Sequence, residues 1–317
     1  MKTVHTVLGP IEPADLGFTL SHEHFMMTDN AMRFNFPGWI DEEAVLAQSI
    51  TEVQLTQACG VNTIIDATPI NLGRDIHLLR NIAKQTGINI IASTGFYYQE
   101  MPWFSPAACS IDKMVELLES EIKNGISGTD SRPGIIKCAT EAPEITPMNE
   151  LFLRMSARLH KATGLPIMTH AHADYRMGLK QQEIFAQEGV DLSKVIIGHC
   201  DDTNETDYIV DVLKNGSYVG MDRIGVVKYN PTENRIDMIE RLLSMGYGDR
   251  LVLSHDCNVM SDCTRVGGNR VIRKDDPVWN FRIVPQVVLP ELARRGIEEE
   301  VIANLKENNI RRFFENL

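Results

Sequence analysis

The sequence predicts a closed (β/α)8 barrel, and three observations lead to this fold class. Eight short stretches are rich in apolar and β-branched residues and contain few alternating polar ones, which is typical of parallel strands buried on both faces. Most of these stretches are separated by segments with the periodicity of helices. Eight such units within 317 residues fit a closed barrel better than an open doubly wound sheet.

The eight predicted strands are spread along the whole chain. The first of them is not followed by a GxGxxG or P-loop signature, which weakens the nucleotide-binding alternative with an open sheet. In chain order the strands are GFTLSHEH (17–24), VNTIIDATP (61–69), INIIASTGF (88–96), GIIKCAT (134–140), LPIMTHAHA (165–173), KVIIGHCDD (194–202), SYVGMDRIG (217–225) and RLVLSHDCN (250–258).

Helical periodicity is clearest in five of the intervening segments. Several of them end in a glycine directly before the next strand, which is the expected stop signal. No low-complexity segment or long linker divides the chain, so we expect residues 1–317 to form a single (β/α)8 barrel domain. The five segments are 41–60, 75–87, 110–125, 148–164 and 235–248.

Composition and charge narrow the class of partner. The net charge of −12 and the pI of about 5.2 argue against nucleic acid and anionic membranes, which are polyanions. A small-molecule substrate is the better expectation. No apolar run approaches the roughly 18 residues that a membrane helix needs, so we expect a cytoplasmic protein. The six cysteines form no CxxC pair and are expected to be reduced thiols.

Ligand-capable side chains gather where the predicted strands end. Because the carboxyl ends of the strands of a (β/α)8 barrel converge on one mouth, these side chains are expected to meet there. They are His22 and His24 on strand one, Lys137 on four, His170 on five, His199 on six, Arg223 after seven and Asp256 on eight. Four histidines and an aspartate in such positions predict a metal site, with zinc as the first choice and cobalt, manganese or iron as alternatives.

The first strand ends in His22-Glu23-His24. Side chains alternate between the two faces of a strand, so the two histidines point the same way and Glu23 points to the opposite face. This spacing differs from the helical HExxH motif, in which two histidines four residues apart bind zinc. We therefore expect His22 and His24 to bind metal, and Glu23 not to be the catalytic acid.

Lys137 is the unusual member of this set, because a positively charged ammonium group would be repelled by metal cations. Burial lowers the pKa of a lysine, so its amine must be neutral or chemically altered at such a site. Carbamylation by carbon dioxide would convert it into a carboxylate able to bridge two metals. From the residue alone, it is equally reasonable that Lys137 is a charged side chain near the metals that binds neither of them, or that it faces the helices.

Six motifs in this order resemble the phosphotriesterase family of the amidohydrolase superfamily. They are SHEH, GIIKCA, MTHAHAD, IGHCDDT, GMDRIG and LSHD, and the resemblance extends over essentially the whole chain. It implies a (β/α)8 barrel with a binuclear metal centre, a hydroxide nucleophile between the metals, and a homodimer. The implied ligands are His22, His24 and Asp256 for a buried metal, His170 and His199 for a more exposed one, and carboxylated Lys137 as the bridge. Asp256 is also the implied proton shuttle.

Within this family, two positions favour a lactonase. Tyr97 follows strand three and Arg223 follows strand seven, and in phosphotriesterase-like lactonases a tyrosine and an arginine at these positions face the substrate. Trp279 and Phe281 could line a channel for an acyl chain. The predicted activity is thus hydrolysis of lactones, including acyl-homoserine lactones, or of related esters, with promiscuous phosphotriesterase activity.

Three alternatives stay open at this point. The chain could be a primary phosphotriesterase, or it could hydrolyse N-acyl amino compounds, because VLGPIEPADLG near its start resembles relatives that act on an N-acyl amino sulfonate. The loop over 257–279 is polar and carries several cations that could meet an anionic substrate. These cations are Arg265, Arg270, Arg273 and Lys274. In a different class, the chain could be a metal-bound binding protein without catalysis.

Overall fold

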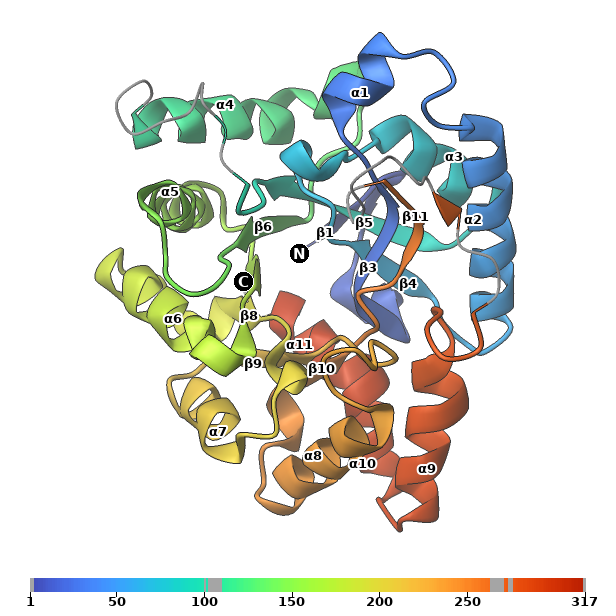
Figure 1. Ribbon diagram of the computed structural model, residues 1–317, viewed down its shortest axis with the longest axis vertical. Coiled ribbons are helices and arrows are strands. Elements are labelled where there is room, and N and C mark those ends of the chain that lie inside the picture. Colours follow the sequence, from blue (N-terminus) through green and yellow to red (C-terminus); the bar gives the residue numbers. More distant parts are fainter. Residues whose placement is uncertain (1–2, 100, 102–109, 263–270, 273–275, 316–317) are drawn as a thin grey trace.

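The strands form a parallel barrel in the computed structural model, which describes residues 3–99, 101, 110–262, 271–272 and 276–315 (Figure 1). The order of hydrogen-bonded neighbours, β10-β9-β8-β7-β6-β5-β4-β3-β11-β12, follows the chain around the barrel. The barrel strands are β3 (Thr19–Met27), β4 (Thr63–Asp66), β5 (Asn89–Gly95), β6 (Ile135–Ala139), β7 (Ile167–His170), β8 (Val195–Ile197), β9 (Tyr218–Met221) and β10 (Leu251–Leu253). The predicted (β/α)8 fold is confirmed.

The eighth strand closes the barrel in two parts. Its first part, β10, pairs with β9, and its continuation, β11 (Asn258–Ser261), pairs with β3. Between the two parts the backbone turns at Asp256, whose φ of 49° lies in the left-handed region. The predicted strand 250–258 is therefore interrupted at the position of a predicted ligand. Two further pairings are antiparallel: β1 (Val4–Thr6) with β2 (Gly9–Ile11), and β11 with β12 (Val271–Ile272).

A ring of helices surrounds the strands and runs in chain order from α2 to α9 in Figure 1. The helices are α1 (Asn30–Asn35), α2 (Glu42–Gln57), α3 (Ile76–Thr86), α4 (Ile111–Asn124), α5 (Pro147–Thr163), α6 (Met177–Gln187), α7 (Thr206–Lys214), α8 (Thr232–Ser244), α9 (Leu289–Arg294), α10 (Glu299–Ala303) and α11 (Asn309–Glu315). Among the residues described above, no helix has both the length and the apolar character required to cross a bilayer.

The predicted elements differ from the observed ones mainly at their ends. The helix expected over 235–248 is α8, Thr232–Ser244, because Pro231 favours an earlier start and Gly246, with a φ of 84°, terminates the helix. The strand expected over 194–202 is only Val195–Ile197, since His199 adopts a left-handed φ of 61° and begins a turn. Both elements stop near a residue with left-handed backbone, Gly246 in one case and His199 in the other.

The two ends of the barrel are chemically different. Its interior at the amino ends of the strands is a buried apolar cluster. Phe313 and Phe314 of α11 belong to this cluster, and the ring of Phe313 packs edge-on against Tyr218 with centroids 5.0 Å apart. The barrel residues of the cluster are Ile65, Ala67, Ile91, Ile135, Met168, Ile196, Tyr218 and Val252. Because α11 covers this end, the polar side chains are concentrated at the other.

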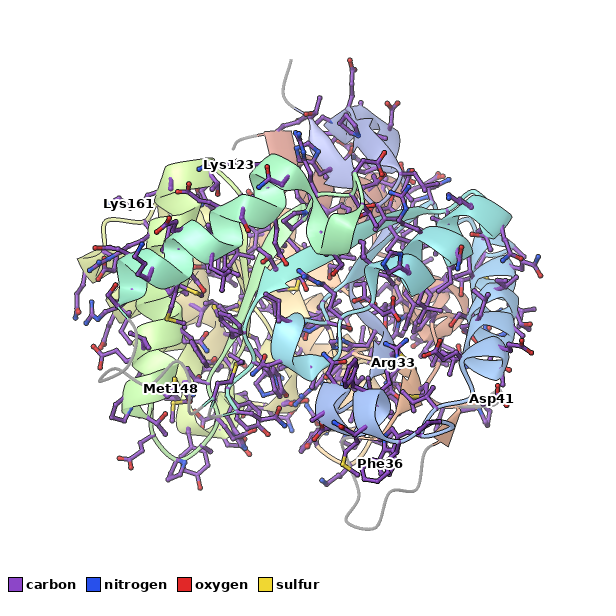
Figure 2. The ribbon with its side chains drawn as sticks, turned by 90° about the horizontal axis from the view of Figure 1, so that it is seen from above. Arg33, Phe36, Asp41, Lys123, Met148 and Lys161 are labelled. Carbon is purple, nitrogen blue, oxygen red and sulfur yellow. The ribbon has the colours of Figure 1, made fainter. Side chains whose placement is uncertain are left out.

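Figure 2 distinguishes the two ends from the side. Asp41 and Met148, at the starts of α2 and α5, lie at one end of the molecule, whereas Lys123 and Lys161, near the ends of α4 and α5, lie at the other. Helices that follow parallel strands begin at the carboxyl ends of those strands. The end with Asp41 and Met148 is therefore the mouth of the barrel.

Candidate metal centre

The six predicted metal ligands lie together at the mouth. All six side chains are at most slightly exposed: Asp256 is 15% exposed, and the four histidines and Lys137 are 7% exposed or less. The distances are 2.5 Å from Lys137 Nζ to His22 Nε2, 3.6 Å from His22 Nε2 to Asp256 Oδ1, 3.0 Å from His24 Nε2 to Asp256 Oδ1, 3.9 Å from His199 Nε2 to Asp256 Oδ2 and 2.9 Å from His199 Nε2 to His170 Nδ1. Residues from five strands thus meet within contact distance.

A buried carboxylate orients two of the histidines. Asp222 Oδ2 lies 2.8 Å from His22 Nδ1, and its Oδ1 lies 2.8 Å from both His199 Nδ1 and the backbone nitrogen of His199. An ionised carboxylate only accepts hydrogen bonds, so both Nδ1 atoms carry the proton and both Nε2 atoms keep a lone pair. These lone pairs point into the site, as in histidine ligands whose other nitrogen is held by a carboxylate.

The other two histidines are held by different neighbours. His24 Nδ1 contacts the hydroxyl of Thr68 at 2.8 Å, which leaves its Nε2 directed at Asp256. His170 Nε2 lies 3.7 Å from a carboxylate oxygen of Glu141, and its Nδ1 faces His199. Each of the four imidazoles therefore has one nitrogen engaged outside the site and one directed into it.

The charge state of the site suits metal binding. Burial lowers the pKa of His22, lowers that of His199 well below its usual range, and lowers that of His170 to about 4, so all three imidazoles are neutral at neutral pH. Neutral imidazole is the form that binds metal. Burial also lowers the pKa of Lys137 to about 8, which increases the share of its uncharged amine.

The donor set fits divalent cations. His22, His199 and Asp256 offer ligand atoms that all lie within 4.8 Å of one another. Two metal–nitrogen bonds of about 2.0–2.1 Å at the tetrahedral angle place the nitrogens about 3.3 Å apart, and His199 Nε2 and His170 Nδ1 lie 2.9 Å apart, within a few tenths of an ångström of that separation. This group of three includes ligands predicted for both metals, His22 for the buried one and His199 for the more exposed one. Asp256 contacts a histidine of each predicted set, His24 and His199.

Asp256 is held as a carboxylate by Arg223. Burial alone would raise the pKa of Asp256, but the guanidinium of Arg223, whose Nε donates to Asp256 Oδ2 at 2.7 Å, holds that pKa well below its usual range. Arg223 Nη1 donates at 2.7 Å to Asp202, and the guanidinium stacks 5.0 Å from the ring centre of Tyr229. Asp256 consequently offers two ionised oxygens to the site.

A cavity of about 310 Å³ opens above these residues. Three predicted substrate-binding residues, Tyr97, Arg223 and Trp279, line it. The hydroxyl of Tyr97 lies 3.3 Å from His170 Nδ1, and the indole of Trp279 donates at 2.8 Å to the carbonyl of His255. The structure brings these three side chains together with the predicted ligands.

The expectation that Phe281 lines the channel is wrong. Its side chain is fully buried and packs edge-on against Phe25, with ring centres 5.8 Å apart, in the layer between barrel and helices. In an extended chain the side chains of residues 279 and 281 would share a face. Residues 277–282 instead form bends and a turn, so Trp279 faces the cavity and Phe281 does not. The predicted cations Arg265, Arg270, Arg273 and Lys274 lie outside the described residues.

Sequence reasoning missed the residues that orient the ligands. Asp222 immediately precedes Arg223 in GMDRIG, and Asp202 lies three residues after His199 in KVIIGHCDD. Both are at the ends of predicted strands, where they could have been identified. Thr68 and Glu141 also follow barrel strands. A search for every polar residue at a strand end, and not only for metal-ligand types, would have included all four.

Replacing Asp222 with asparagine is expected to weaken binding of divalent metal by about 10- to 100-fold. An amide has one acceptor oxygen where the carboxylate has two, so His22 and His199 can no longer both be held with Nε2 facing the site. Competition between the protein and a chelator measures the change. The control is Asp191→Asn, which alters an exposed aspartate that accepts a backbone bond from Ser193. An affinity unchanged within about twofold would contradict the orienting role.

Comparison with known proteins gives the same family along the whole chain. The model of the phosphotriesterase family matches residues 2–314. The phosphotriesterase homology protein of Mycobacterium tuberculosis is 39% identical, over 99% of this chain and 98% of that protein. The aryldialkylphosphatase of Saccharolobus solfataricus is 38% identical over 96% of each chain. The N-acetyltaurine hydrolase of Xenopus tropicalis is 28% identical, also over 96% of each.

A solved structure agrees with these sequences. The phosphotriesterase from M. tuberculosis superposes with a TM-score of 0.90 at 38% sequence identity, covering 99% of this chain and 98% of that chain. Family and fold therefore agree, and the predicted hydrolase class is confirmed. The chain belongs to the phosphotriesterase family.

Proposed function

We propose that this chain is a metal-dependent hydrolase of lactones and related carboxylic esters, acyl-homoserine lactones among them, that also hydrolyses phosphotriesters. The observation that supports this most directly is the arrangement at the cavity floor. Asp256 and the buried Lys137 lie among four ligand-ready histidines, and Tyr97 and Arg223 stand beside them. This combination offers metal ligands, a proton acceptor and hydrogen-bond donors around one small space.

The cofactor we propose is a pair of divalent cations, zinc in the first instance, with cobalt, manganese or iron as alternatives. When bound, the ions would supply the Lewis acidity that activates water and polarises the scissile group. The proposed division is His22, His24 and Asp256 for one ion and His170 and His199 for the other. Lys137, carboxylated on Nζ, is proposed as the residue shared by both.

The protein's own residues account for proton transfer and orientation. Asp256 is proposed to accept a proton from the attacking water and to return it to the leaving oxygen as the ester bond breaks. Arg223 holds this carboxylate in place through the 2.7 Å hydrogen bond. Burial raises the pKa of Tyr97 well above its usual range, so its hydroxyl remains a donor that can orient the substrate carbonyl.

The cavity supports a small, largely uncharged substrate. Its volume of about 310 Å³ is at the lower end of the range for small-molecule sites. Leu72, Val226 and Trp279 form the apolar part of its wall. Arg223 is a cationic residue of the described lining that could face a substrate, but its guanidinium is already paired with two carboxylates. A lactone ring with a modest acyl group satisfies these conditions better than a substrate with a free anionic end.

Two other substrate classes follow from the relatives. The aryldialkylphosphatase at 38% identity supports primary phosphotriesterase activity, and the N-acetyltaurine hydrolase at 28% identity supports hydrolysis of N-acyl amino compounds. We further propose that residues 1–317 act as a single barrel domain, in the cytoplasm and as a homodimer. The family match over 2–314 supports the first of these assignments.

A direct test compares kcat/KM for an acyl-homoserine lactone, a δ-lactone, paraoxon and an N-acyl amino acid, after the metal content of the protein has been measured. We expect two metal ions per chain and a kcat/KM for at least one lactone that exceeds that for paraoxon by about tenfold or more, equivalent to about 1.4 kcal/mol in barrier. Two bound metals without turnover of any of these compounds would favour the non-catalytic binding protein.

A further inference from the structure

Glu23, between the two histidines of the first barrel strand, is fully buried and points away from the cavity. In the hydrogen bonds that the structure describes for it, its carboxylate binds residues 254–257, where the eighth strand is interrupted. Ser254 Oγ donates to Oε1 at 2.7 Å, the backbone and Nδ1 of His255 donate to Oε1 at 3.1 and 2.5 Å, and the backbone of Cys257 donates to Oε2 at 2.9 Å. One side chain of β3 thus binds the residues on both sides of Asp256.

The backbone of Asp256 itself is bound by the same strand. Its N–H donates at 3.0 Å to the carbonyl of His22, so three consecutive amides, at 255, 256 and 257, all donate to β3. A non-glycine residue at a φ of 49° is conformationally strained and persists only where its surroundings fix it. Here the surroundings that fix it are the Glu23 carboxylate and the His22 carbonyl.

Ser254 and His255 are residue types that form nucleophile–base pairs, but their hydrogen bonds exclude that chemistry here. The backbone N–H of Val284 donates to His255 Nε2 at 2.9 Å, so that nitrogen is the acceptor and Nδ1 carries the proton given to Glu23. Ser254 Oγ donates to Glu23, not to the imidazole, and accepts from the backbone of His22 at 2.9 Å. Both side chains are fully buried. The hydrogen bonds of this cluster therefore hold the backbone on both sides of Asp256 in place.

We propose that Glu23 is a positioning residue that sets the orientation of Asp256 toward the metal centre. The first strand then acts through both of its faces: His22 and His24 enter the site from the inner face, and Glu23 fixes a third ligand from the outer face. This inference rests on the proposed function, because it takes Asp256 to be a metal ligand. It assigns a role to the acidic residue of the His-Glu-His sequence that metal ligation leaves unexplained.

The test measures binding of Co²⁺ alone to the metal-free full-length chain, by competition with a chelator and by the visible absorption of the bound ion. Glu23→Gln preserves size, but its amide nitrogen would face the N–H of Cys257 or His255, donor against donor. We expect Co²⁺ affinity to fall by about 10- to 100-fold, with an altered absorption spectrum. The matched control is Glu52→Gln, a buried glutamate that accepts the backbone N–H of Phe281 at 3.2 Å and lies 3.6 Å from the Nε of Arg282.

A second variant keeps the proposal testable if Glu23→Gln does not fold. Ser254→Ala removes one hydrogen bond to Glu23, together with the one that Ser254 accepts from the backbone of His22. We expect it to weaken Co²⁺ binding by about two- to tenfold in the same direction. If the wild-type chain binds no Co²⁺, the proposed function and this inference both fail. If the wild type binds Co²⁺ and the folded variants match it in affinity and spectrum, with only a lower melting temperature, Glu23 is merely structural and this inference alone is overturned.

Discussion

Lys137→Ala is expected to lose most of the bound metal and to lower kcat by about 10³-fold or more. Lys137 is 1% exposed, and its Nζ lies 2.5 Å from His22 Nε2, so the amine occupies the centre of the donor set and not its edge. Truncation to alanine removes the proposed bridge and leaves a space lined by imidazoles. Metal content, measured by elemental analysis after gel filtration, and initial rates of lactone hydrolysis are the two readouts.

Rescue separates a bridging carboxylate from a packing role. A short carboxylic acid such as acetate or propionate can enter the space left by the side chain, and we expect it to restore part of the metal content and part of the rate. Lys161→Ala serves as the control, because Lys161 lies at the opposite end of the barrel (Figure 2), where its Nζ donates to the carbonyl of Glu188. Unchanged metal content in Lys137→Ala would mean that the lysine is not a ligand.

The strand-end rule explains why much of this site could be predicted from the sequence. A parallel barrel brings the carboxyl ends of distant strands to one mouth, so residues as far apart in sequence as His22 and Asp256 could be placed together once the strands were recognised. Period-two alternation then placed Glu23 on the opposite face from His22 and His24. Both inferences depend on regular geometry that the apolar pattern encodes directly.

The parts that could not be predicted depend on irregular backbone and on individual hydrogen bonds. The left-handed conformations of His199 and Asp256 follow from contacts with Asp222 and Glu23, which no local pattern specifies. Asp222 binds two histidines from strands 200 and 23 residues away in sequence. The burial of Phe281 likewise follows from its packing against Phe25 and not from its distance to Trp279.

Asp256→Asn is expected to lower kcat/KM by about 10³-fold while leaving more metal bound than Lys137→Ala does. Asparagine keeps one oxygen near His24 Nε2, which the carboxylate contacts at 3.0 Å, so partial ligation survives. It cannot accept a proton at neutral pH, and it presents an amide nitrogen or a neutral oxygen to the Nε of Arg223. Rates for a lactone and for paraoxon, each normalised to bound metal, measure the effect.

The control for this substitution is Asp202→Asn, which removes the other carboxylate that binds the guanidinium of Arg223, at 2.7 Å. A loss of Arg223 orientation alone should raise KM and lower kcat modestly, by about 10-fold or less, and leave metal content unchanged. The two variants separate proton transfer from orientation, since only Asp256→Asn abolishes the acceptor. If Asp256→Asn retained a metal-normalised kcat within about tenfold of the wild type, Asp256 would be a ligand only. The proton would then have to leave through another group. Glu141, which lines the cavity and lies 3.7 Å from His170 Nε2, is the next acceptor in reach.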